Sequence, residues 1–132
     1  MKRMLFAALL VVSPLLMTPS VHAAAPSWCR LVSLHGYWVE ERMTQRGPWS
    51  SLTKAQKRYY RGVEKKADDA RLAALRAIYR DRSSVGRSLT RDLALLDTFT
   101  FDIPVNERQE FVDAKIRVRQ NIRGVCGIEW SL

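Results

Sequence analysis

The feature that most constrains the fold is a proline-free stretch, residues 51–82. Small or apolar residues recur in it at steps of three and four, which places them on one face of a helix. They are Tyr60, Val63, Ala67, Ala70, Ala74 and Ala77. With Ser51 as its N-cap, one such helix would extend about 48 Å, at about 1.5 Å per residue. Other segments must therefore pack along it, unless a break near Gly62 or Asp68-Asp69 divides it in two.

Three further segments show helical signals. The expected helices span residues 27–46, 51–82, 85–98 and 106–123. Gly47-Pro48 should end the first of them, and Asn106 with Gln109 resembles a capping box at the start of the last, which Gly124 should end. Residues 98–103 alternate in polarity and suggest an extended connector that lays its aromatic side chains on the helices.

The two cysteines of the chain stand near the two ends of this helical region. Cys29 and Cys126 form an even pair, which in an oxidising compartment predicts a disulfide. Two free thiols, or pairing between chains, are the alternatives. The bond would join the first helix to the last, and an up-down-up-down arrangement also places both termini at one end. The sequence therefore predicts an all-α protein, an antiparallel four-helix bundle with its ends joined by one disulfide, or five shorter helices if the long one breaks.

The first residues have the features of an export signal. Lys2 and Arg3 precede an apolar run, residues 5–16, and Val21-His22-Ala23 resembles a cleavage site. We expect residues 1–23 to be a cleavable signal peptide and residues 24–132 to form a single helical domain. The apolar run is too short to serve as an uncleaved membrane anchor, and no other apolar stretch could cross a membrane. The product would therefore be exported, either periplasmic or secreted, with no transmembrane segment after signal removal.

The charge of the expected mature chain is positive. Without Lys2 and Arg3, 20 Lys and Arg side chains stand against 13 Asp and Glu, a formal charge of +7. Such an excess favours acidic partners, whether proteins, anionic envelope polymers or lipid headgroups. Nucleic acid is disfavoured as the partner, because an exported protein seldom meets it and no DNA-binding module is recognisable.

The sequence offers little for catalysis. It has no phosphate-binding loop, dinucleotide fingerprint or calcium loop, so no cofactor is expected. A metal site is not expected either, because the mature chain has a single histidine, His35, and its cysteines are expected to be bonded to each other. His35 falls on an apolar helix face, where a satisfied, buried histidine is the ordinary interpretation. The adjacent carboxylates Glu40-Glu41 and Asp68-Asp69 are better explained as surface ion pairs than as a catalytic pair, because neighbours on a helix diverge.

The candidate binding site is a basic stripe on the first half of the long helix. Lys54, Arg58, Arg61 and Lys65 are spaced by four, three and four residues, which stacks four cations on one face. Tyr59 and the loop residue Trp49 lie near the stripe and could anchor a partner. The ordinary interpretation of such a stripe is a solvated helix face, and the leading interpretation of Trp49 is a lid that folds back on the core.

These observations favour an exported, non-enzymatic helical protein that binds an acidic protein partner through its basic face. An inhibitor, an immunity factor, a chaperone or an assembly subunit would act in this way. A binder of anionic envelope polymers or lipid headgroups is the alternative, and a small secreted enzyme using carboxylates or His35 is a more distant one. The motifs identify no family.

Overall fold

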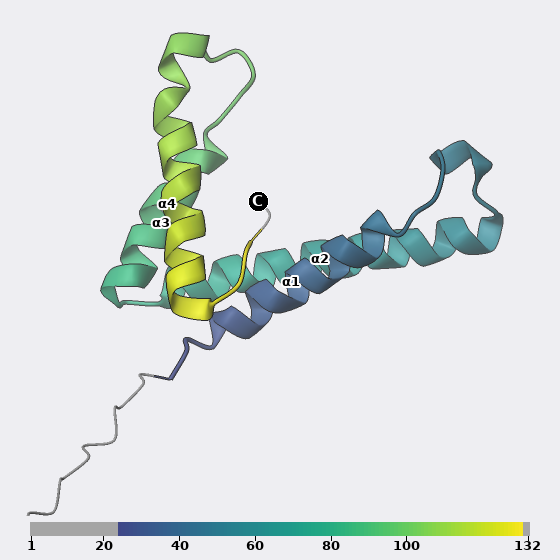
Figure 1. Cartoon of the computed structure of the whole chain (residues 1–132), viewed down its shortest axis with the longest axis horizontal. Helices are drawn as coiled ribbons and strands as arrows, with labels where there is room; N and C mark the ends of the chain where they lie inside the picture. The colour runs from purple at the N-terminus through teal and green to yellow at the C-terminus, as the bar shows by residue number, and fades with distance from the viewer. Residues whose placement is uncertain (1–23, 131–132) are drawn as a thin grey trace, which may run out of the picture.

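The computed structural model describes residues 24–130 and folds them into four α-helices joined by short connections (Figure 1). The elements are α1 (Trp28–Met43), the 3₁₀ turn η1 (Trp49–Ser51), α2 (Lys54–Arg80), α3 (Ser84–Asp97), the 3₁₀ turn η2 (Val105–Glu107) and α4 (Gln109–Cys126). Among these residues no strand occurs. The all-α class with four mutually packed helices is confirmed, and so is the disulfide that joins the first helix to the last.

The helices are arranged as two antiparallel hairpins. Figure 1 shows α1 lying along α2, and α3 lying along α4. The α3–α4 hairpin rises steeply from one end of the α1–α2 hairpin, so the molecule has the outline of a letter L. The other end of the α1–α2 hairpin, where η1 lies, projects away from the rest of the molecule.

A tight turn at residues 81–83 sets the corner between the hairpins. The Asp81 carboxylate accepts the indole N–H of Trp28 at 2.8 Å and the backbone N–H of Ser83 at 2.9 Å. These bonds, the one from Trp28 first, hold the pKa of Asp81 below its usual value. Ser83 caps α3 by accepting the Gly86 N–H at 3.1 Å. A Cβ at Gly86 would lie 2.4 Å from the Asp81 carbonyl oxygen, so only glycine permits this approach.

α2 begins two residues later than the sequence suggested. Thr53, not Ser51, is the N-cap: its hydroxyl accepts the Gln56 N–H at 3.1 Å, and the Gln56 side chain accepts the Thr53 N–H at 2.9 Å. This capping box satisfies two N–H groups at once, whereas Ser51 lies in η1 and bonds back to Pro48. The helix then runs unbroken for 27 residues through Gly62.

The ends of α4 also differ from the expectation. Asn106 does not cap the helix, because it lies in η2 and α4 begins only at Gln109. The helix continues through Gly124 to Cys126, and Gly127 ends it in the left-handed conformation, with φ of +68°. That conformation favours glycine, so Gly127 and not Gly124 ends the helix.

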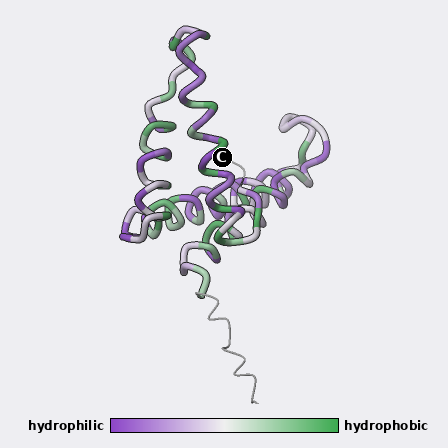
Figure 2. Tube along the Cα trace, turned by 60° about the vertical axis from the view of Figure 1, so that its left-hand side comes forward, coloured by the Kyte–Doolittle hydropathy of each residue, from purple (hydrophilic) through white to green (hydrophobic). Residues whose placement is uncertain are grey.

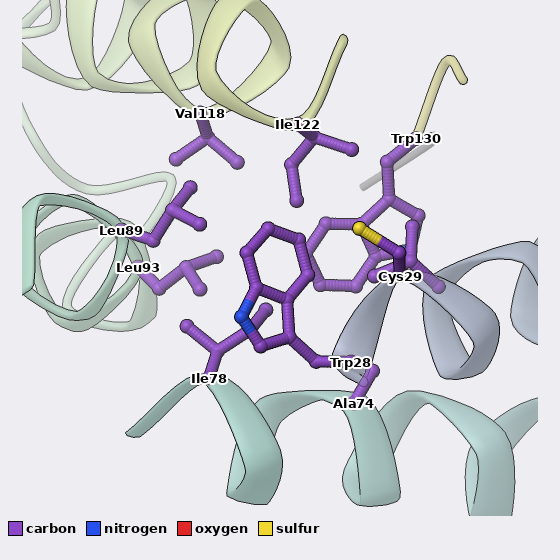
Figure 3. Packing of buried hydrophobic residues seen from close by; sticks show 10 residues of the cluster. Trp28, Cys29, Ala74, Ile78, Leu89, Leu93, Val118, Ile122 and Trp130 are labelled. Carbon is purple, nitrogen blue, oxygen red and sulfur yellow. The ribbon is translucent and has the colours of Figure 1, made fainter. Parts of the chain in front are cut away.

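The core lies at the corner, where both hairpins contribute side chains (Figure 3). Trp28 occupies its centre and is 1% exposed. The buried residues around it are Val32, Ala74, Ile78, Leu89, Leu93, Val118, Ile122 and Trp130. The Cys29–Cys126 bond, with Cα atoms 5.4 Å apart, borders this cluster and ties the start of α1 to the end of α4.

The connector before η2 contributes one of its two phenylalanines to the packing. Phe99 is half-buried and meets the Phe111 ring edge-on, with centroids 5.2 Å apart. Phe101 is 86% exposed, so the expectation that both rings would cover the helices is only partly met. The predicted signal peptide, residues 1–23, lies outside the described residues. Within residues 24–130, no helix has the length and apolarity needed to cross a membrane.

Candidate functional site: the tip of the α1–α2 hairpin

The outer part of the α1–α2 hairpin, residues 42–66, carries the charge excess of residues 24–132. We call this segment the hairpin tip. It holds eight Lys and Arg side chains and a single acidic one, Glu64. The remainder of residues 24–132 has twelve basic and twelve acidic side chains and is therefore neutral overall. The formal charge of +7 of residues 24–132 is thus concentrated on the end of the α1–α2 hairpin that projects away from the core (Figure 1).

The basic stripe runs along the outer face of α2 within this tip. Lys54, Arg58, Arg61 and Lys65 are all exposed. Arg61 and Lys65 each stand two positions from Val63, which is 2% exposed and faces α1, and a step of two residues turns a helix by about 200°. The stripe therefore points away from α1. Figure 2 shows mainly polar colours at this end of the molecule.

Trp49 belongs to this surface and not to the core. The Arg61 guanidinium lies over its ring, 5.6 Å from the ring centroid. Its side chain is 36% exposed, so it does not form the lid on the core that the sequence had made the leading interpretation. The short η1 turn places it there, because residues 49–51 fold back onto the beginning of α2 rather than onto the corner.

Two other predicted site residues have partners within the protein. The Tyr59 hydroxyl donates to the Glu41 carboxylate of α1, which raises the pKa of Tyr59 to about 12. Tyr59 is still 51% exposed. Lys65 forms an ion pair with Asp69, one turn later, at 2.6 Å, and this hydrogen bond raises its pKa. Among the described residues, Lys54 and Arg58 have no such ion pair or aromatic partner.

The structure adds further cations to the site that the sequence analysis did not single out. Lys66 lies over the ring of Trp38 of α1, 4.4 Å from its centroid. Lys57, Arg42 and Arg46 complete the charge of the tip. A running count of charge along the chain would have found this concentration, whereas a search along one helix face isolates only four of its members.

His35 forms a hydrogen bond with a structural role. It is 6% exposed, and its Nδ1 accepts the indole N–H of Trp130 at 2.8 Å, so the expectation of a satisfied, buried histidine is confirmed. This bond holds the tail after α4 against α1. Burial first, and then the charge of Arg71, lower the pKa of His35 from its usual 6.5; Arg42 lowers it further and Asp68 opposes both.

Acidification is expected to weaken the fold through this histidine. Below pH 6.5 the unfolded chain binds a proton that folded His35 resists, so the free energy of unfolding decreases as the pH is lowered. Above pH 6.5 the contribution of His35 to the free energy of unfolding is constant. Denaturant titrations at about pH 7.5 and about pH 5.5 would measure the fall, which for one proton cannot exceed about 1.4 kcal/mol per pH unit. His35→Gln is the control, because its amide oxygen can still accept the Trp130 N–H without titrating. An identical pH slope in the two proteins would contradict the expectation.

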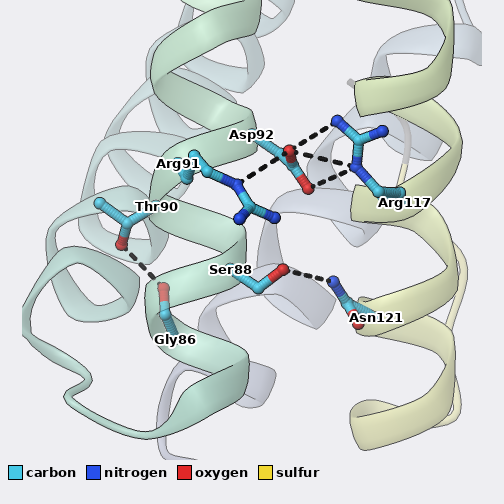
Figure 4. Close-up of polar contacts among 7 residues, drawn as sticks. All are labelled: Gly86, Ser88, Thr90, Arg91, Asp92, Arg117 and Asn121. Carbon is cyan, nitrogen blue, oxygen red and sulfur yellow. Dashed lines mark hydrogen bonds and ion pairs between the residues drawn. The ribbon is translucent and has the colours of Figure 1, made fainter.

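An ion pair between a buried carboxylate and a partly exposed guanidinium joins α3 to α4 away from the tip (Figure 4). Asp92 is 1% exposed and accepts three bonds from the Arg117 guanidinium, from Nη2 at 2.9 Å and from Nε at 3.1 Å and 3.3 Å. Spacing along α4 alone would pair Arg117 with Asp113, four residues before it, but the Asp113 carboxylate accepts a bond from the Gln109 side chain. A partner on another helix cannot be read from spacing along one helix, and this pair serves to fasten the second hairpin.

No group of three or more potential metal ligands occurs within the described part of the chain. Comparison with protein-family models, with curated proteins and with solved structures finds no match. What this chain binds must therefore be inferred from its own side chains.

Proposed function

We propose that this protein is an exported, non-enzymatic binding protein that holds an acidic partner protein at its hairpin tip. The observation that carries the proposal is the charge distribution: the tip has eight basic side chains and one acidic one, while the rest of residues 24–132 is neutral. Cations gathered this closely repel one another, and an acidic surface that approaches them relieves the repulsion.

The tip also offers the anchors that specific protein interfaces use. Trp49 and Tyr59 are partly exposed, and both are held by contacts within the protein, to Arg61 and Glu41 respectively. Aromatic side chains that are fixed before binding lose little entropy when a partner covers them. Arg58 has no such contact among the described residues and can form bidentate bonds with a carboxylate.

Anionic polymers or lipid headgroups of the cell envelope are the second candidate, and the size of the charge excess favours them. A polymer responds to the field of the whole tip, so its affinity would fall steeply with added salt and depend little on which cation is removed. A folded partner protein would instead depend strongly on particular side chains.

The experiment uses oxidised protein as bait in an envelope extract, at low and then at moderate salt, followed by affinity measurements with the captured partner. In Arg58→Glu with Arg61→Glu the affinity should fall by about tenfold or more. The matched control is Arg76→Glu with Arg119→Glu, which changes the net charge equally at exposed positions outside the tip. Equal losses in both variants would favour the general field, and unchanged binding in the first would rule out the tip.

A further inference from the structure

The angle between the two hairpins contains a pocket that the proposed function does not use. Its volume is about 550 Å³, which is within the range of small-molecule sites. Leu75 of α2, Leu93 of α3 and Phe111 of α4 contribute apolar walls, and the half-exposed Tyr79 and Val112 also line it. All three helices contribute, so the cavity depends on how the two hairpins meet.

Three cations line the same pocket, against one carboxylate. Arg71 comes from α2, Arg108 from the residue before α4 and Lys115 from α4; Asp97 is the single acidic side chain. Among the described residues neither Arg71 nor Lys115 forms an ion pair. An apolar cavity with an uncompensated positive charge is complementary to a molecule that is apolar over most of its surface and anionic at one end.

One of these cations is held in place before any ligand arrives. Arg108 donates from Nε to the Ile103 carbonyl and from Nη2 to the Phe101 carbonyl, each at 2.8 Å, and its guanidinium lies 5.9 Å from the centroid of the Phe99 ring. Two of the five N–H donors of a guanidinium are used in this way, and the others remain for an anion. A fixed donor loses less entropy on binding than a free side chain.

We propose that this pocket binds a fatty acid of the length of dodecanoate as its carboxylate. The acyl chain would lie against Leu75, Leu93 and Phe111, and the carboxylate would be neutralised by the pocket cations. A neutral or cationic chain of the same length would leave these cations uncompensated. The occupant is taken to be a free fatty acid and not a membrane surface, because the cations belong to the walls of a cavity and come from three segments of the chain.

The test measures binding of monomeric dodecanoate to the oxidised protein by titration calorimetry, with dodecanol and dodecyltrimethylammonium as matched probes. We expect saturable binding of dodecanoate and about tenfold weaker binding of the two others. Amide chemical-shift changes should include Leu75, Leu93 and Phe111. Equal binding of all three probes, or shifts confined to other surfaces, would overturn the proposal.

Two variants make the assignment specific. Arg71→Gln with Lys115→Gln should weaken dodecanoate about tenfold, whereas Arg76→Gln with Arg119→Gln, on the same two helices but outside the pocket, should change it less than about twofold. Val112→Trp should block the cavity with little harm to folding, because Val112 is 48% exposed.

Binding to vesicles containing phosphatidylglycerol but not to monomeric dodecanoate would refute the free-acid assignment. Arg58→Glu with Arg61→Glu should leave dodecanoate binding within about twofold, which separates this test from that of the tip.

Discussion

Reduction of the Cys29–Cys126 disulfide is expected to lower the free energy of unfolding by about 4 to 5 kcal/mol in the loop-entropy model. The bond closes a loop with a sequence separation of 97, so it restricts most of the unfolded chain. It also ties the start of α1 to the end of α4 beside the core, at the corner where the hairpins meet. Denaturant titrations of oxidised and reduced protein, followed by circular dichroism, would measure the difference.

The control is the double substitution Cys29→Ala with Cys126→Ala. It should unfold at nearly the same denaturant concentration as the reduced protein, because both lack the cross-link, and it should not respond to reductant. If the reduced protein were as stable as the oxidised one, the corner would be held by its apolar packing alone, and the cross-link would have no thermodynamic role.

The helices and their pairing could be predicted because they follow from local patterns. Steps of three and four from Val63 to Ala74 define the buried face of α2, and residues along that face are the ones that the structure buries. The cysteine pair and the short connections agreed on where the termini meet. Helix boundaries were predicted less accurately, because several neighbouring residues can cap a helix. Thr53 caps α2 in place of Ser51, because Gln56 stands three residues after Thr53 and completes a capping box.

The angle between the hairpins could not be predicted from periodicity. A hydrophobic stripe shows which face of a helix is buried but not the direction in which its partner crosses. That direction depends on tertiary contacts, such as the close approach of Gly86 to Asp81 and the bond from Trp28 to the Asp81 carboxylate. The pocket at the corner follows from this crossing, whereas the Asp92 ion pair depends on how α3 lies against α4 within one hairpin, so neither could be predicted from periodicity.

The candidate site was predicted only in part, because contacts between two helices cannot be derived from spacing along one of them. The four stripe cations share one face of one helix, so spacing alone brings them together. The bond between Tyr59 and Glu41, and the placement of Lys66 over Trp38, join α1 to α2 and require the hairpin to be in register. Whether the tip binds an acidic protein remains the proposal that the charge-reversal experiment tests.

Replacing Trp28 with alanine is expected to destabilise the fold by about 3 to 5 kcal/mol. The indole is 1% exposed at the centre of the core, so its removal leaves a cavity shared by α2, α3 and α4 (Figure 3). The substitution also removes the hydrogen bond to Asp81 at the corner turn. Denaturant titration of the oxidised variant would measure the loss.

Trp28→Phe separates the two contributions, because phenylalanine fills most of the cavity but has no N–H to donate. We expect it to cost about 1 to 2 kcal/mol, less than alanine, because Asp81 lies in the turn and still accepts the Ser83 N–H. The half-buried Trp38, on the same helix but outside the core cluster, provides the matched comparison, and Trp38→Ala should cost clearly less than Trp28→Ala. Equal losses at both tryptophans would show that the stability is spread along the α1–α2 hairpin. A loss confined to Trp28 would show that the stability comes mainly from the corner. The sequence of the tip could then vary without unfolding the protein.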